Sequence, residues 1–247
     1  MCRLYRLARL IGAVAILMGC LSGWAGATPT TQIWTPSVAD VQPYKVWHLT
    51  YDTYFSVARK LNRGGHAFPV DLGLTVGILP YKNANLEVGF DLFEPTDYPL
   101  QFNAKFGVPE GGAGRGAPGF AVGVFGVGTQ KGVTNYNVVY GVVTKTLGTL
   151  GRAHVGYYRG NKKLLVDPGG KADEHGLMVA FDHVLVKDRL ILLGDWQQGK
   201  NALGAGAFGL SYNFAPNVGV IFGYTIFNSE AINGKPMLTV QLDVNIK

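Results

Sequence analysis

Apolar side chains alternate one-for-one with small or polar side chains through most of this chain, and this period-two pattern limits the folds it can adopt. Even-numbered positions from 68 to 78 are apolar, whereas the odd-numbered positions between them include aspartate, threonine and glycine. The same alternation returns at residues 86–92, 100–106 and 238–246. Side chains two apart lie on one face of a β-strand, so each segment predicts a strand with one apolar face. Helix-period patterning is essentially absent after residue 28.

About twelve segments of this kind follow one another along the chain. Most are near ten residues long, the length that a tilted strand needs to cross the hydrocarbon layer of a membrane. An even number of such strands predicts an all-β fold, a transmembrane antiparallel up-and-down β-barrel of about twelve strands, over residues 46–247. The expected strands are 46–57, 68–79, 84–93, 99–107, 119–130, 133–146, 151–160, 175–184, 189–198, 203–213, 217–227 and 237–246.

The connections between these segments alternate in length, as expected for a barrel with both termini in the periplasm. Four connections on the expected periplasmic side are tight turns, at 80–83, 147–150, 185–188 and 215–216. Longer loops on the opposite side span 58–67, 161–174 and 229–236. One connection breaks the rule, because residues 108–118 form an eleven-residue link where a short turn is expected. Either a strand boundary is misplaced there or a flexible periplasmic loop is present.

The first 27 residues have the three-part order of a secretory signal peptide. Three arginines precede an apolar core at residues 10–21, and residues 25–27 (AGA) supply the small side chains that signal peptidase requires. We expect cleavage after Ala27. A rival site at residues 17–20 (LMGC) resembles a lipobox and would leave Cys20 lipidated. Residues 28–45 carry three prolines and little alternation, which predicts a periplasmic lead-in or a small plug that enters the barrel.

A soluble β-sandwich would also alternate, but its polar faces would be solvated and charged. Here the polar faces are rich in glycine (35 of 247 residues), and only 15% of residues are charged. Tyrosine and tryptophan gather near strand ends, as in the aromatic girdles of membrane barrels. The signal-like segment and residues 46–246 together resemble bacterial outer-membrane β-barrel proteins of the porin-like kind. That resemblance implies an outer-membrane location and contact with outer-membrane lipid. These barrels usually end in an aromatic residue, whereas this chain ends in Val-Asn-Ile-Lys.

Charge and cysteine content exclude several other classes. Without the three arginines of residues 1–27, the 22 basic residues fall to 19 against 16 acidic ones, so no nucleic-acid-binding footprint is expected. Both cysteines lie at positions 2 and 20. The remaining chain therefore has no disulfide framework, no cysteine nucleophile and no thiolate metal site. We expect no cofactor and no metal.

Glycine-rich look-alikes of nucleotide-binding motifs occur but lack their context. Residues 194–200 have P-loop spacing, yet Asn201 stands where a Ser or Thr must reach magnesium. Residues 204–209 spell a dinucleotide fingerprint but lead into a strand pattern instead of a helix. Outer-membrane lipid hydrolases resemble one another in a His-x-Ser pair on one strand, and this chain has none. Spatial pairing of a histidine such as His48 or His154 with a hydroxyl stays open, and we predict no catalytic residue.

The polar faces of the strands predict the chemistry of the lumen. If the apolar faces meet lipid, carboxylates outnumber basic side chains inside the barrel, where Lys145 and Arg152 are further basic candidates. Carboxylates along a narrow aqueous path favour cations. The alternative is that these charges pair with one another and pack the lumen shut. Inward glycines such as Gly77 would widen the bore locally. The expected lumen-lining residues are Asp52, Asp71, Glu87, Asp91, Lys105, Asp182, Asp195 and Asp243.

Three functional hypotheses of different classes follow. The first is a narrow outer-membrane channel or porin for small solutes that are cationic or neutral. The second is a closed barrel that anchors or scaffolds a periplasmic or outer-membrane protein partner. The third is a barrel enzyme acting on lipid, which the missing His-x-Ser pair weakens, so that a non-enzyme is expected.

Overall fold

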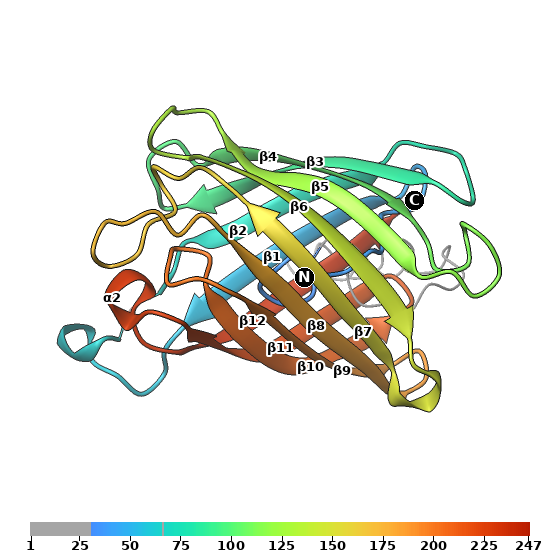
Figure 1. Ribbon diagram of the computed structural model, residues 1–247. Coiled ribbons are helices and arrows are strands. Elements are labelled where there is room, and N and C mark those ends of the chain that lie inside the picture. Colours follow the sequence, from blue (N-terminus) through green and yellow to red (C-terminus); the bar gives the residue numbers. More distant parts are fainter. Residues whose placement is uncertain (1–30, 66) are drawn as a thin grey trace, which may run out of the picture.

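The computed structural model describes residues 31–65 and 67–247. The expected signal peptide and both of its processing sites lie outside the described residues. Twelve antiparallel strands of the described chain form one closed barrel, in which each strand pairs with its sequence neighbours and β12 closes on β1 (Figure 1). The predicted fold class is confirmed, and each strand begins and ends within two residues of its expected bounds. The strands are β1 (Trp47–Phe55), β2 (Val70–Gly77), β3 (Asn85–Glu94), β4 (Leu100–Val108), β5 (Gly119–Gly128), β6 (Asn135–Thr146), β7 (Arg152–Arg159), β8 (His175–Val186), β9 (Leu190–Gln197), β10 (Ala205–Ala215), β11 (Val218–Phe227) and β12 (Met237–Ile246).

The pairing register keeps the two faces of the strands separate around the barrel. Leu72 of β2 lies opposite Leu92 of β3, and the next residue, Gly73, lies opposite Asp91. Outward residues therefore pair with outward residues, and inward residues with inward ones. A slip by one residue would move every apolar side chain of a strand into the lumen, so the sequence specifies the register strongly.

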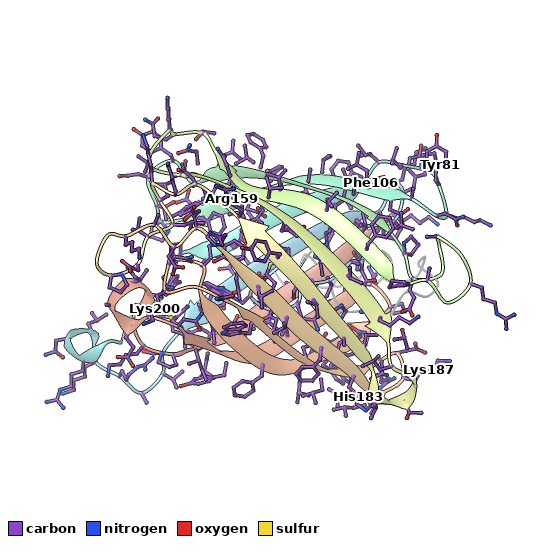
Figure 2. The ribbon with its side chains drawn as sticks, in the orientation of Figure 1. Tyr81, Phe106, Arg159, His183, Lys187 and Lys200 are labelled. Atoms are coloured by element: carbon purple, nitrogen blue, oxygen red, sulfur yellow. The ribbon has the colours of Figure 1, made fainter. Side chains whose placement is uncertain are left out.

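The outer surface of the barrel is a continuous apolar belt. Large apolar side chains that are more than a third exposed come from all twelve strands, and Phe208 and Phe222 are 54% and 53% exposed. Figure 2 shows side chains projecting outward from the wall of the barrel, with Phe106 of β4 labelled. In water such a belt would drive aggregation, whereas lipid is its natural solvent. One member from each strand, in chain order, is Tyr51, Leu72, Val88, Phe106, Phe120, Val139, Val155, Leu177, Trp196, Phe208, Phe222 and Leu242.

The two ends of the barrel differ in the length of their connections. Short turns, including η3 (Gly148–Leu150), lie at the end where β1 begins and β12 stops. Longer loops with η2 (Leu61–Arg63) and α2 (Glu230–Asn233) lie at the opposite end, as the positions of α2 and the C-terminus show in Figure 1. Short turns are periplasmic in barrels of this type, which makes the long-loop end extracellular. No helix in the described chain is long and apolar enough to cross a membrane.

The connection between β4 and β5 is a genuine loop at the short-turn end. β4 ends at Val108 and β5 begins at Gly119, so the idea of a misplaced strand boundary is wrong. Three glycines with positive φ, Gly111, Gly114 and Gly116, allow the chain to fold back on itself. The carboxylate of Glu110 accepts a hydrogen bond from Lys145 Nζ at 2.7 Å and ties the loop to the end of β6.

Candidate functional site in the barrel lumen

Residues 31–45, here called the lumen segment, run through the inside of the barrel. Ile33, Ser37 and Val38 are each 1% exposed or less, although this segment forms no strand. At the periplasmic end Gly77 makes room for the chain, because a Cβ there would lie 2.1 Å from the carbonyl oxygen of Pro43. This inward glycine accommodates the lumen segment instead of widening a bore.

Asp195 of β9 holds the beginning of the lumen segment. One carboxylate oxygen, Oδ2, accepts hydrogen bonds from the backbone N–H groups of Ile33, Trp34 and Thr35, at 2.9, 2.8 and 3.0 Å. The carbonyl oxygen of Ile33 accepts a further bond from Gln241 Nε2 at 2.8 Å. Three converging N–H groups form an anion-binding concavity, so a carboxylate in the wall fixes the backbone of the lumen segment.

An aromatic cluster lies beside this anchor, towards the extracellular end. The Trp34 ring meets Tyr54, Phe227 and Phe68 edge-on, with ring centroids 5.3, 5.5 and 6.3 Å away. Trp34 Nε1 donates to the carbonyl oxygen of Leu203 at 2.8 Å, so its polar atom is satisfied. Edge-to-face contacts of this kind add to the free energy of apolar burial. The cluster therefore packs part of the lumen with side chains.

The middle of the lumen segment is held by a charged network on β6, β7 and β8. Arg152 donates to Asp40 Oδ2 at 2.7 Å and to both oxygens of Asp182. His154 Nε2 lies 2.9 Å from Asp182 Oδ2, and His154 Nδ1 lies 2.7 Å from the hydroxyl of Thr144. Arg152, expected as a basic lumen residue, thus joins the wall to the lumen segment.

A second network holds the periplasmic half of the lumen segment against β3 and β4. Glu87 Oε2 accepts the backbone N–H of Gln42 at 2.6 Å, and Lys105 Nζ lies 3.5 Å from Glu87 Oε1. Lys105 Nζ also donates to the carbonyl oxygen of Asp40 at 2.7 Å. Glu87 and Lys105 are each 1% exposed. Breaking such a buried pair leaves an uncompensated charge, so the two side chains act as a unit.

His48 and Asp243 form a third polar group, where β1 meets β12. His48 Nε2 lies 3.2 Å from Asp243 Oδ1, and its Nδ1 lies 3.0 Å from Asn245 Oδ1. Gln42 Nε2 donates to the same Asn245 oxygen at 2.6 Å. With the bonds of Tyr54 to Ile33, of Lys45 to Gly77 and of Gln32 to Phe181, the lumen segment is bonded to the wall on β1, β2, β3, β4, β6, β7, β8, β9 and β12.

Asp52, Asp71 and Asp91 lie on the inner faces of β1, β2 and β3, and are here called the acidic trio. Asp52 accepts from the Thr50 hydroxyl at 2.7 Å, and Asp91 accepts from Asn103 Nδ2 at 2.8 Å. Within residues 31–65 and 67–247 none of the three has an ion-pair partner. Asp71 and Asp91 are half-buried, whereas the other expected lumen-lining residues are buried. The trio lies in the extracellular half of the lumen.

The eight expected lumen-lining residues all lie on the inner face, but they fall into separate groups. The acidic trio stands together, Glu87 pairs with Lys105, and Asp182, Asp195 and Asp243 each belong to a different cluster. Lys145 was wrongly expected inside: its side chain is 41% exposed and pairs with Glu110 at the periplasmic rim. Alternation explains this error, because the buried inward residue next to it is Thr144.

Sequence reasoning missed the partners that the lumen segment supplies. These partners belong to a segment without strand periodicity, so the sequence pattern does not predict which way they face. They are Asp40, the side chain of Gln42 and the N–H groups of residues 33–35. With Asp40 included, the described lumen holds eight carboxylates against two permanently charged basic side chains, Lys105 and Arg152. The imbalance makes the interior strongly acidic. No group of three or more His, Asp or Glu side chains in the described chain is arranged to hold a metal ion.

Thr144, His154 and Asp182 are hydrogen-bonded in series, as the nucleophile, the base and the orienting acid of a hydrolase would be. His154 and Thr144 are 1% and 2% exposed and face the lumen, and the Thr144 oxygen accepts the N–H of Ala39 at 2.9 Å. The guanidinium of Arg152 shares the Asp182 carboxylate. Thr144 and Arg152 contact the lumen segment, and lipid in the membrane faces the opposite side of the wall.

These features define the class of the molecule: it is a transmembrane β-barrel of the bacterial outer-membrane type, with an apolar outer belt and a polar lumen. The NanC porin has a similar fold, with a TM-score of 0.52 and 9% identity over 81% of this chain and 99% of that chain. At this identity the likeness shows the fold alone.

Two further solved barrels align less closely. An outer-membrane channel from Pseudomonas putida F1 gives a TM-score of 0.47 at 9% identity, over 83% of this chain and 97% of that chain. The outer membrane phospholipase A from Escherichia coli gives 0.46 at 12% identity, over 83% and 93%. No family model matches the chain, and no curated protein sequence matches it.

Proposed function

We propose that this protein is an outer-membrane channel for small cations and neutral solutes, and that residues 28–45 act as its plug. The acidic trio carries the proposal. Asp52, Asp71 and Asp91 stand in the extracellular half of the lumen without an ion-pair partner in the described chain, and two of them are half-buried. Carboxylates along a narrow aqueous path attract cations and repel anions, because the low-dielectric wall strengthens their field.

The contacts of the lumen segment are suited to reversible displacement. They are hydrogen bonds to the wall, with a net contribution of about 0.5–1.5 kcal/mol for each neutral bond and about 1.5–3 kcal/mol for each bond to a charged side chain, because water replaces the lost partner. The segment belongs to no strand, so its release breaks no rung of the barrel. In the seated arrangement, the aromatic cluster around Trp34 narrows the path. A shift of the lumen segment would open it next to the acidic trio.

Planar-bilayer recording of the purified barrel tests both parts of the proposal. The reversal potential under a KCl gradient gives the ratio of cation to anion permeability. We expect cation preference in the wild type and a clear reduction of it in D52N/D71N/D91N. The matched control is D167N, which removes a carboxylate from an exposed extracellular loop and should leave the ratio unchanged. Anion preference in the wild type, or absence of conductance from the wild type and from a variant with a loosened lumen segment, would refute the channel.

A closed barrel that anchors a partner is the second candidate, and the dense packing of the lumen segment favours it. Gentle solubilisation of membranes that contain the full chain would then recover a stoichiometric periplasmic or outer-membrane protein. Removing residues 110–117 from the β4–β5 loop would release that partner while the barrel stays folded. Conductance with cation preference and no stoichiometric partner would exclude the anchor.

A lipid-hydrolysing barrel is tested by assaying phospholipid hydrolysis with wild type, H154A and T144V. We expect no hydrolysis above background in any of the three. Activity in the wild type that both substitutions abolish would overturn the non-enzymatic assignment.

A further inference from the structure

A cavity of about 480 Å³ lies at the extracellular rim, between the β7–β8 loop and the β9–β10 loop. Lys200, labelled in Figure 2 near the long-loop end, is one of its lining residues. The cavity is separate from the lumen, and none of the functional hypotheses uses it. Its lining consists of Asp167, Lys171, Ala172, Asp173, Trp196, Gln198, Gly199, Lys200 and Asn228.

Strand alternation places this cavity on the outside of the barrel. Asp195 points inward to the lumen segment, so Trp196, the next residue in β9, points outward. Trp196 is 37% exposed and stands opposite Val179 of β8, which belongs with Leu177 and Phe181 to the exposed apolar belt. The cavity therefore lies at the level where lipid headgroups meet the membrane surface, directly above lipid-facing side chains.

The cationic groups of the cavity are uncommitted, whereas its carboxylates are partly engaged. Within the described chain neither Lys171 nor Lys200 forms an ion pair. Asp167 Oδ1 accepts the N–H groups of Gly169 and Lys171, both at 2.9 Å. Asp173 Oδ2 accepts the N–H of Lys200 at 2.5 Å. Asp167 thus has one oxygen turned to the backbone of its own loop, whereas one oxygen of Asp173 joins the β7–β8 loop to the β9–β10 loop.

Hydrogen bonds hold the walls of the cavity in place. Asn228 accepts from Trp196 Nε1 at 3.2 Å and donates to the carbonyl oxygens of Gln197 and Gly199, both at 2.8 Å. Gln198 Oε1 accepts the N–H of Leu177 at 3.0 Å. The Nε2 group of Gln198 has no hydrogen bond among the described residues. A preformed pocket with free donors avoids part of the ordering cost of binding.

We propose that this cavity binds the phosphorylated sugar headgroup of an outer-leaflet glycolipid. The ammonium groups of Lys171 and Lys200 bind phosphate, the Trp196 indole packs on a sugar ring, and Gln198 Nε2 donates to a sugar oxygen. Acyl chains then run down the apolar belt over Leu177. The β7–β8 loop, residues 160–174, is neutral overall, with three lysines against three carboxylates, and Lys200 adds one positive charge to the cavity wall. This inference is independent of the channel proposal.

Native mass spectrometry of the purified barrel in detergent tests the assignment with three probes. These are a diphosphorylated glucosamine-disaccharide lipid, its dephosphorylated form and inorganic phosphate. We expect one tightly bound copy of the phosphorylated lipid, and at least tenfold weaker binding to K171A/K200A. The matched control is K162A/K163A, which removes the same charge from two exposed lysines in the β7–β8 loop that do not line the cavity. It should bind within twofold of wild type.

The outcomes separate the alternatives. Equal losses in the two double variants would mean diffuse electrostatic attraction and would overturn the site. Binding of the dephosphorylated lipid as tight as that of the phosphorylated one would also overturn it. Phosphate binding that depends on Lys171 and Lys200, without lipid binding, would assign the cavity to free phosphate and refute the lipid assignment. Heat-dependent gel mobility verifies that each variant is a folded barrel.

Discussion

Replacing Asp195 with asparagine is the sharpest perturbation of the lumen segment. The change keeps the shape of the side chain but removes the charge that three backbone N–H groups of residues 33–35 share. The barrel wall is untouched, because β9 pairs with β8 and β10 through its backbone. We therefore expect D195N to assemble normally and to release the beginning of the lumen segment more often.

The magnitude follows from the three hydrogen bonds. A bond to a charged group contributes roughly 1.5–3 kcal/mol, and a neutral bond roughly 0.5–1.5 kcal/mol, so three bonds lose about 3 kcal/mol together. Part of this loss is returned, because a buried carboxylate is costlier to desolvate than an amide, and Asp195 Oδ1 has no partner in the described chain. A net shift of about 2 kcal/mol corresponds to roughly thirtyfold more of the released state.

A cysteine reporter measures this shift directly. No cysteine follows position 20, and Ser37, in the middle of the lumen segment, is fully buried. In S37C, the rate of labelling by a membrane-impermeant maleimide is proportional to the fraction of time that the segment is released. We expect S37C/D195N to be labelled about thirtyfold faster than S37C alone, with D167N as the control that leaves the rate unchanged.

One result would refute this reasoning. If D195N changes the labelling rate by less than twofold while heat-dependent gel mobility shows a folded barrel, Asp195 does not hold the lumen segment. Rapid labelling of S37C in the wild type would go further. It would mean that the segment does not rest in the lumen, and the plug would fail independently of any conductance.

Three further predictions concern other contacts. G77A places a Cβ 2.1 Å from the carbonyl oxygen of Pro43, so the periplasmic end of the lumen segment must move, and the same cysteine reporter should be labelled faster. Hydrogen bonds from the Lys145 ammonium and from Thr146 lower the pKa of Glu110 from 4.5 to about 2; the contact is therefore complete above pH 4.5 and lost as the pH falls towards 2. A carbon-13 NMR titration of the Glu110 carboxyl group should give a higher titration midpoint in K145M than in the wild type. R152M leaves two carboxylates without their guanidinium and should lower the urea midpoint of unfolding, by an amount that pH-matched denaturation curves measure.

The sequence predicted the barrel well because one physical signal dominates it. Lipid outside and polar groups inside impose strict alternation on every strand, and a slip in register is costly on both faces. The bounds of β12, Met237–Ile246, match the expectation at both ends. The bounds of glycine-rich β5, Gly119–Gly128, also lie within two residues of the expected 119–130. Its place follows from the clearer patterns of its neighbours β4 and β6.

The contents of the lumen were only partly predictable. Alternation tells which way Asp195 or Glu87 points, but not what it meets. Their partners are backbone N–H groups of residues 33–35 and 42, which any residue type except proline would supply. Residues 31–45 have no periodicity, because they contact different walls in succession and repeat no pattern. For Lys145 the predicted direction itself was wrong. Alternation in β6 turns Thr144 inward, so Lys145 points away from the lumen and pairs with Glu110 at the periplasmic rim.

The distribution of these contacts bears on how the lumen segment could work. Arg152, Lys105 and Glu87 hold residues 40–42 against β7, β4 and β3, and their charges are neutralised by their partners. Asp52, Asp71 and Asp91 stand on the side that the segment does not neutralise. A carboxylate that stays charged there needs water or a cation beside it, because an unpaired buried charge is strongly unfavourable and a carboxyl without either takes up a proton. This distribution is the ground for the proposal that water, and cations with it, stand beside the acidic trio.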